Sequence, residues 1–131
     1  MAKRLSRNTF IMDKPPTIHS YAAVVGKKEG DGPLGRHFDQ VYQDPYFGQD
    51  TWEKAESELL RLTVMKALEK GKLRCEDINY MFAGDLINQC TSTSYGLREL
   101  EIPLLCVYGA CSTMSESLLM ASLMTDSDIG G

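Results

Sequence analysis

The chain has 131 residues, of which 43% are hydrophobic and 24% charged, and its formal net charge is −4. This composition supports a packed core and excludes wholesale disorder, and the acidic balance argues against nucleic acid as a partner, because nucleic-acid-binding surfaces are usually basic. No apolar run reaches the roughly 18 residues that span a bilayer, and the chain does not begin with a secretory signal, so we expect synthesis in the cytosol without passage across a membrane.

Residues 1–17 read as a polar, basic arm that ends in two prolines, which block helix and favour an extended backbone. A strand is predicted over residues 18–25. Residues 26–50 are rich in glycine and then in aromatic residues, and they predict a long loop of the kind that serves as a lid or a binding surface. Within that loop, Tyr46 and Phe47 are expected to form an internal anchor.

Amphipathic periodicity predicts a helix that follows Asp50 and ends at Gly71. Asp50 is the expected N-cap, with Glu53 completing a capping box, and Gly71 suits a helix C-terminus. Apolar side chains recur near the helical period at Trp52, Ala55, Leu59, Leu60, Val64, Ala67 and Leu68.

Two further strands are predicted at 78–84 and 102–108, with a short helix around 92–100 between them. The apolar run of the second strand predicts burial on both faces, as in a parallel sheet. A last helix, over 110–124, carries only Glu116 as a charged residue, so we expect burial on nearly all its sides. The order of these elements predicts an α/β fold with a mainly parallel sheet, right-handed crossovers and a buried central helix.

The segment 108–114 joins the last predicted strand to this helix and contains Gly109-Ala110-Cys111-Ser112. Small residues allow a sharp turn, so Cys111 is expected near the helix N-terminus, where free N–H groups and the helix dipole favour a carboxylate, a thiolate or an oxyanion. Inert packing is the alternative, and spacing alone favours it, because cysteines in apolar stretches are usually structural.

The other cysteines and the two histidines give weaker signals. No two cysteines form a CxxC pair and the histidines are distant from them, so no metal site is predicted. A disulfide framework is not expected in a cytosolic chain. Structural or solvated roles are expected for Cys75, Cys90, Cys106, His19 and His37.

Several motifs together resemble a known family. The run 78–124, with its Gly-Ala-Cys-Ser step, is similar to the first half of the thiolase and ketoacyl-synthase fold. More narrowly, segments 32–35, 38–39, 51–56, 83–90 and 108–114 together resemble the family of stage V sporulation AD proteins of spore-forming bacteria. After the basic arm over 1–17, the resemblance implies a thiolase-like N-terminal half over 18–124 and a divergent tail over 125–131.

The resemblance implies binding rather than acyl transfer. Members of the family belong to a channel assembly that moves dipicolinic acid, alone or as its calcium chelate, into the developing spore and out at germination. They are implied to lie at the periphery of the spore inner membrane, attached through membrane-embedded subunits. Cys111 matches the pocket cysteine, Ala110 and Ser112 flank it, and no cofactor is implied.

Two alternatives remain open. A thiolase-like acyltransferase would use Cys111 as a nucleophile that forms an acyl thioester, but it needs a general base that the sequence does not evidently supply. A structural or regulatory fragment would associate through its surface, and in thiolase-like folds the strand before the cysteine helix often pairs across a dimer axis. Residues 104–108 would then form a homodimer contact.

The family fold repeats its βαβαβ unit and places the pocket helix between two sheets, whereas this sequence supplies the first half. Residues 125–131 lack the next strand, and we expect a truncated or frameshifted end. The helix over 110–124 would then expose several large apolar side chains, each worth about 1.5–3 kcal/mol when buried, against a typical domain stability of about 5–15 kcal/mol. We therefore expect the isolated chain to be unstable, to aggregate or to need a partner.

Overall fold

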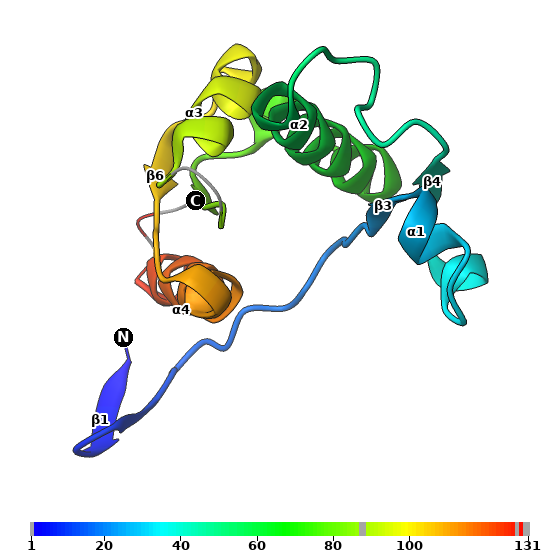
Figure 1. Cartoon of the computed structure of the whole chain (residues 1–131). Coiled ribbons are helices and arrows are strands. Elements are labelled where there is room, and N and C mark those ends of the chain that lie inside the picture. Colours follow the sequence, from blue (N-terminus) through cyan, green and yellow to red (C-terminus); the bar gives the residue numbers. More distant parts are fainter. Residues whose placement is uncertain (1, 87–88, 128, 130–131) are drawn as a thin grey trace.

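The computed structural model describes residues 2–86, 89–127 and 129. It is a mixed α/β structure in which the described strands form three separate two-stranded sheets, so the expected single sheet is wrong. Two of these sheets are parallel: β3 (Val24–Gly26) with β4 (Gln40–Tyr42), and β5 (Met81–Ala83) with β6 (Leu104–Cys106). Figure 1 shows the β3–β4 pair and β6 on opposite sides of the long helix α2 (Trp52–Gly71), which keeps the two sheets apart.

The N-terminal arm contains a hairpin, where the sequence predicts only an extended lead-in. Strand β1 (Lys3–Ser6) pairs antiparallel with β2 (Thr9–Ile11), and the side chains of both strands are exposed. Extended chain then leads to β3, and the hairpin lies at the far end of this segment in Figure 1.

The predicted strand over 18–25 is correct only at its end, because β3 begins at Val24. Its earlier residues attach to the C-terminal part of α2 through side chains instead of pairing with a strand. The Ser20 hydroxyl donates to the carbonyl of Ala67 at 2.7 Å, and Nε2 of His19 lies 3.2 Å from the carbonyl oxygen of Gly71.

The region 26–50 is not a plain loop. It contains the short helix α1 (Lys27–Gly30), a 3-10 turn η1 (Gly35–His37) and strand β4. A Cβ on Gly35 would overlap the backbone of Gly30, so glycine serves close packing here and not only loop flexibility.

The expected internal anchor in this region is confirmed. The ring of Tyr46 stacks on that of Trp52, with centroids 4.2 Å apart, and Phe47 packs against Tyr42 at 5.2 Å. These contacts fix the approach of the chain to α2.

Helix α2 has its predicted extent but a different N-cap. The hydroxyl of Thr51 accepts the N–H of Lys54 at 3.3 Å, whereas the predicted cap, Asp50, pairs with the ammonium group of Lys54 at 2.8 Å. At the other end Gly71 is helical, and Lys72 takes the left-handed conformation with φ 55°.

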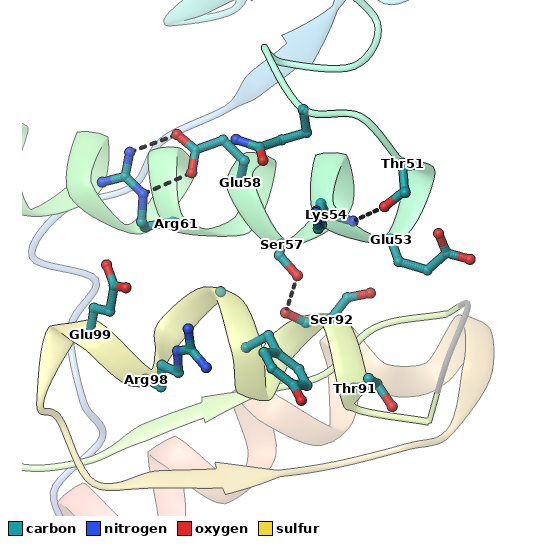
Figure 2. A pocket seen from close by; sticks show the side chains of 13 residues that line it. Thr51, Glu53, Lys54, Ser57, Glu58, Arg61, Thr91, Ser92, Arg98 and Glu99 are labelled. Atoms are coloured by element: carbon teal, nitrogen blue, oxygen red, sulfur yellow. Dashed lines mark hydrogen bonds and ion pairs between the residues drawn. The ribbon is translucent and has the colours of Figure 1, made fainter.

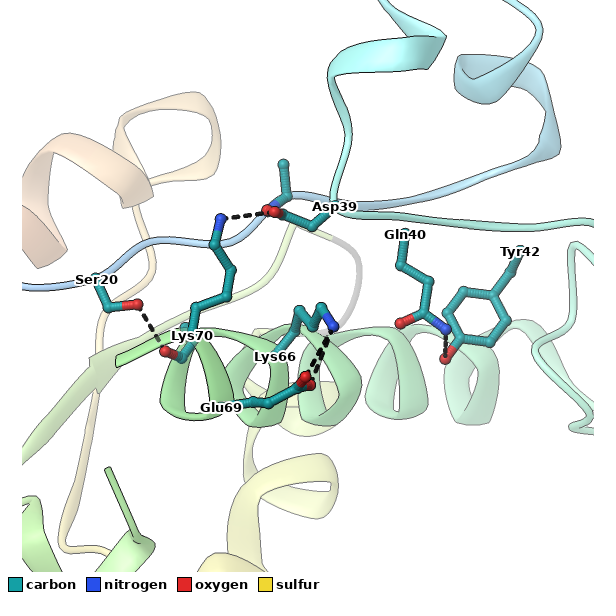
Figure 3. A network of polar contacts seen from close by, with 9 residues as sticks. Ser20, Asp39, Gln40, Tyr42, Lys66, Glu69 and Lys70 are labelled. Atoms are coloured by element: carbon teal, nitrogen blue, oxygen red, sulfur yellow. Dashed lines mark hydrogen bonds and ion pairs between the residues drawn. The ribbon is translucent and has the colours of Figure 1, made fainter. Parts of the chain in front are cut away.

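Figure 3 shows how the C-terminal end of α2 holds the β3–β4 pair. The ammonium group of Lys70 lies 2.6 Å from Oδ1 of Asp39, and the N–H of Ala23 donates to Oδ2 at 2.8 Å. These bonds, that from Lys70 first, hold the pKa of the Asp39 carboxyl below its ordinary value.

The main core lies between α2, α3 (Thr91–Leu97), the following turn η3 (Arg98–Leu100) and the β5–β6 pair. Leu97, Leu100 and Ile102 are buried at its centre. Partly buried side chains surround them, from Leu60, Val64, Cys75, Ile78, Met81, Ala83 and Leu104. The predicted burial of 102–108 on both faces is wrong, since Leu105 and Cys106 are exposed and no further layer of the described chain covers them.

The last helix, α4 (Thr113–Asp126), packs against β5 on one side. Burial on nearly all sides is therefore wrong for this chain. As expected, several large apolar side chains of this helix are solvent-exposed: Met114 by 71%, Leu118 by 53%, and Leu119 and Met120 by 42% each. The helix is held at its C-terminal end, where the buried carboxylate of Asp126 accepts the N–H of Lys14 at 2.8 Å.

Candidate functional site

The candidate site is the edge of the β5–β6 pair where both parallel strands end. Ligand sites in parallel α/β sheets form beyond the carboxyl ends of the strands. The N–H of Val107 donates to the carbonyl of Ala83 at 3.0 Å, so the two chains stay together past the strands. A Cβ on Gly84 would overlap the carbonyl oxygen of Val107 and press on Thr113, so only glycine allows this approach.

Asp85 organises one half of this edge. Its side chain is buried, and its carboxylate accepts the N–H of Thr93 at 2.9 Å, the Thr93 hydroxyl at 2.8 Å and the N–H of Cys90 at 3.1 Å. Both N–H groups lie at the start of α3. The first N–H groups of a helix have no acceptor within the helix, so Asp85 supplies one. Asp85 thus fixes α3 against β5, a role that the sequence analysis missed although Asp85 stands directly after a predicted strand.

The Gly-Ala-Cys-Ser motif forms the other half. Ala110–Ser112 is a 3-10 turn, η4, in which Ala110 has φ 51°, and α4 begins directly after it at Thr113. Cys111 is therefore at the start of the helix, where the sequence places it, and its side chain is exposed.

Glu116 contacts this turn, a role that sequence reasoning missed because it noted Glu116 only as the charged residue of the last helix. The hydroxyl oxygen of Ser112 lies 2.7 Å from the carbonyl oxygen of Gly109 and also contacts the carboxylate of Glu116, which lies in the first turn of α4, so these two acceptors share the single hydroxyl proton. A carboxylate is stabilised at this electropositive end of a helix. The carboxylate of Glu116 thus occupies the helix N-terminus where the sequence predicts a bound carboxylate, thiolate or oxyanion.

Two more cysteines lie at the same edge. The thiol of Cys90 donates to the carbonyl of Val107 at 3.3 Å, and the sulfur of Cys106 lies 3.7 Å from the hydroxyl of Ser94. Burial raises the pKa of the Cys90 thiol, and the neighbouring thiol of Cys106 adds to the shift.

A cavity of about 560 Å³ lies elsewhere, between α2 and α3 (Figure 2). The two helices touch beside it, where Ser57 donates to the carbonyl of Ser92 at 2.8 Å and Gly96 packs on the backbone of Ser57. The lining carries both charges, including the ion pair of Arg61 with Glu58 at 2.6 Å.

A second cavity of about 180 Å³ lies between α4 and the region of β5. Cys111 lines neither cavity. Within the described ranges, no group of three or more His, Cys, Asp or Glu side chains is gathered to hold a metal ion. Among the same residues, no helix has both the length and the apolar character of a membrane span.

Comparisons with known proteins agree on one family. The family model described as Stage V sporulation protein AD matches residues 6–130. Stage V sporulation protein AD of Bacillus subtilis (strain 168) is 40% identical over 124 residues, which cover 95% of this chain and 37% of the relative. The chain thus spans little more than a third of the length of that relative.

Proposed function

The chain belongs to the Stage V sporulation protein AD family, and from this premise we propose that it forms the first part of a dipicolinic acid-binding component of the channel that moves this acid during sporulation and germination. The matched motif, Gly109 to Ser112, carries the proposal. It lies at the carboxyl edge of a parallel strand pair and directly precedes α4. Such an edge is where parallel α/β sheets bind ligands.

The proposed ligand contacts are at the turn before α4. Dipicolinate is a planar dicarboxylate, and backbone N–H groups at a helix N-terminus bind anions of this kind. Cys111 and Ala110 line the proposed pocket, and the Ser112 hydroxyl donates to the ligand when it turns away from Glu116. The rest of the pocket would come from parts of a longer family member.

The carboxylate of Glu116 favours the calcium chelate over the free acid as the ligand. A free dianion at this turn would meet the negative charge of Glu116, which is hydrogen-bonded to Ser112. In the chelate, calcium offsets the ligand charge and prefers oxygen ligands such as a carboxylate. Glu116 would then help to hold the chelate.

The family context also supports a peripheral position at the spore inner membrane, reached through membrane-embedded channel subunits. In a thiolase-like fold a second half covers the helix that follows the cysteine. The exposed apolar side chains of α4 agree with such a cover.

A calorimetric titration tests the binding proposal. Dipicolinate with and without calcium is titrated into a longer protein of the family that carries this turn, and into its Cys111→Ala variant. We expect tighter binding with calcium and weaker binding by the variant. Equal affinities of the two proteins would remove Cys111 from the site, and no binding by either would refute the proposed function.

Acyl transfer is the second candidate, supported by the exposed thiol of Cys111 and the nearby carboxylate of Glu116, a group able to accept a proton. Mass spectrometry after incubation with acyl-CoA separates the two functions. A stable acyl adduct on Cys111 supports transfer, and an unmodified Cys111 supports binding alone.

A homodimer through residues 104–108 is compatible with either function. Strand β6 pairs with β5 on one edge only among the described strands, so its other edge offers backbone groups to a second copy. Size-exclusion chromatography with light scattering measures whether the chain forms this dimer.

A further inference from the structure

Two thiols meet where the start of α3 faces the end of β6. Cys90 precedes α3, and Cys106 is the last residue of β6. The sulfur of Cys90 contacts the carbonyl of Val107, the neighbour of Cys106, at 3.3 Å. In the other direction, the sulfur of Cys106 contacts the hydroxyl of Ser94, whose N–H donates to the carbonyl of Cys90 at 2.9 Å. Each thiol thus contacts the segment that carries the other, so the two sulfur atoms lie close to one another.

The surroundings of the two thiols differ in a way that orders their reactivity. Cys106 is exposed, whereas Cys90 is partly buried and donates its proton to a carbonyl group. Burial and the thiol of Cys106 raise the pKa of Cys90. An external reagent therefore reacts with Cys106 first, and the less accessible Cys90 thiol reacts second.

We propose that Cys90 and Cys106 form a two-thiol exchange site that reacts with small-molecule disulfides and closes to an intramolecular disulfide. The Cys106 thiolate attacks one sulfur of the small disulfide, forms a mixed disulfide and releases one thiolate. The Cys90 thiolate then attacks the sulfur of Cys106, forms the Cys90–Cys106 bond and releases the second thiolate. The two protons of the protein thiols pass to the released thiolates, so one disulfide is reduced to two thiols and one is formed.

Closure changes the candidate site without touching Cys111. The new bond ties the start of α3 to the end of β6 and removes the Cys90 thiol from the carbonyl of Val107. That carbonyl packs on Gly84 at the base of the turn before α4. The oxidation state of the thiol pair therefore acts on the shape of this turn.

The test is oxidation of the reduced 131-residue chain with glutathione disulfide, followed by alkylation and peptide mapping by mass spectrometry. We expect the main product to contain the Cys90–Cys106 bond, to have lost the mass of two hydrogens and to carry no glutathione. In the Cys90→Ser variant, Cys106 should keep a stable glutathione adduct because no thiol resolves it. The matched control, Cys75→Ser, should behave like the parent chain.

Oxidation in concentrated urea tests whether the folded structure, and not closeness in the sequence, decides which cysteines pair. In an unfolded chain the shortest loop closes most readily, so Cys106 should pair with Cys111. We expect the native chain to give Cys90–Cys106 and the unfolded chain to give mainly Cys106–Cys111. The proposal is overturned if both conditions give the same product, or if the native Cys90→Ser chain loses its glutathione as the parent does.

The pH dependence of closure gives a second readout. Because the pKa of Cys90 is raised, few Cys90 thiolates exist at neutral pH, and the rate of the second step should keep rising with pH into the alkaline range. A closure rate that levels off near neutral pH would contradict the assignment of Cys90 as the second nucleophile.

Discussion

The carboxylate of Asp85 holds Thr93 by two atoms at once, the backbone N–H at 2.9 Å and the hydroxyl at 2.8 Å. Both residues are buried. The pair joins the end of β5 to the first turn of α3, and Asp85 directly follows Gly84, which packs closely against Val107 and Thr113. The geometry of the candidate site therefore depends on a buried polar contact and not only on apolar packing.

Replacement of Thr93 by valine should destabilise the chain. The change keeps the shape of the side chain but leaves a buried charged oxygen without its hydroxyl donor, which costs about 1–3 kcal/mol. Urea denaturation followed by circular dichroism measures the difference in the free energy of unfolding. Ser94→Ala, one residue later on an exposed position, is the matched control and should have little effect. Equal stabilities of Thr93→Val and the parent would show that the Asp85 contact is energetically unimportant.

Replacement of Gly96 by alanine should separate α2 from α3. A Cβ at this position would overlap the backbone of Ser57, and such overpacking typically costs about 1–3 kcal/mol. The greater helix propensity of alanine returns only about 1 kcal/mol, so the net change is a loss of stability. Gly26→Ala is the control, because its Cβ would make only an ordinary contact with Phe47. A stabilised Gly96→Ala chain would contradict the close crossing of the two helices.

The contact of Asp39 with Lys70 should weaken in acid. The pKa of Asp39 is lowered in the folded chain by its bonds to Lys70 and Ala23, so its ionised form favours the folded state. This contribution is complete above the unfolded pKa of about 3.9 and is lost as the pH falls through the lower folded pKa. Nuclear magnetic resonance of the Ala23 N–H measures the loss. In Asp39→Asn the shift of this signal with pH should disappear, and its persistence would assign the titration to another group.

The sequence predicts whether most elements are helices or strands better than it predicts which other elements pack against them. Helix α2 follows from its own periodicity and α4 from its apolar run, which are local properties. The separate sheets do not follow, because β3 has no strand partner before Val24 and its preceding residues bond to α2 through Ser20. The exposure of Leu118 is also invisible to periodicity, because an apolar pattern does not say whether a covering layer is present.

The place of Cys111 in the fold was predictable from the sequence, but the contacts around it were not. A cysteine after small residues, between a strand and a helix, is enough to place Cys111 before α4. The contacts of Glu116 and Asp85 depend on how turns fold back on the helices. Cys90 and Cys106 are 16 residues apart in the sequence and meet because the start of α3 packs beside β6. Spacing alone therefore assigns them inert roles.

Replacement of Glu116 by glutamine tests the electrostatics of the proposed dipicolinate site in a longer family member. Without the negative charge, the affinity for free dipicolinate should rise severalfold, and the advantage of the calcium chelate should shrink. The helix itself should lose about 0.3–1 kcal/mol, because a favourable charge at its N-terminus is removed. Glu99→Gln, which lines the distant α2–α3 cavity, is the control. Unchanged calcium preference in Glu116→Gln would exclude Glu116 from the ligand contacts.

Replacement of Leu118 by glutamate should reduce self-association of the isolated chain. Leu118 is 53% exposed beside Met114, Leu119 and Met120, and an apolar surface of this kind promotes association. The charge should shift the molecular mass measured by light scattering towards that of the monomer and should not remove a core contact. Leu34→Glu is the control, because Leu34 is equally apolar and 60% exposed but lies near η1. If both variants reduce association equally, net charge and not the face of α4 controls it. If neither variant changes it, association uses another surface, and the edge of β6 is the next to test.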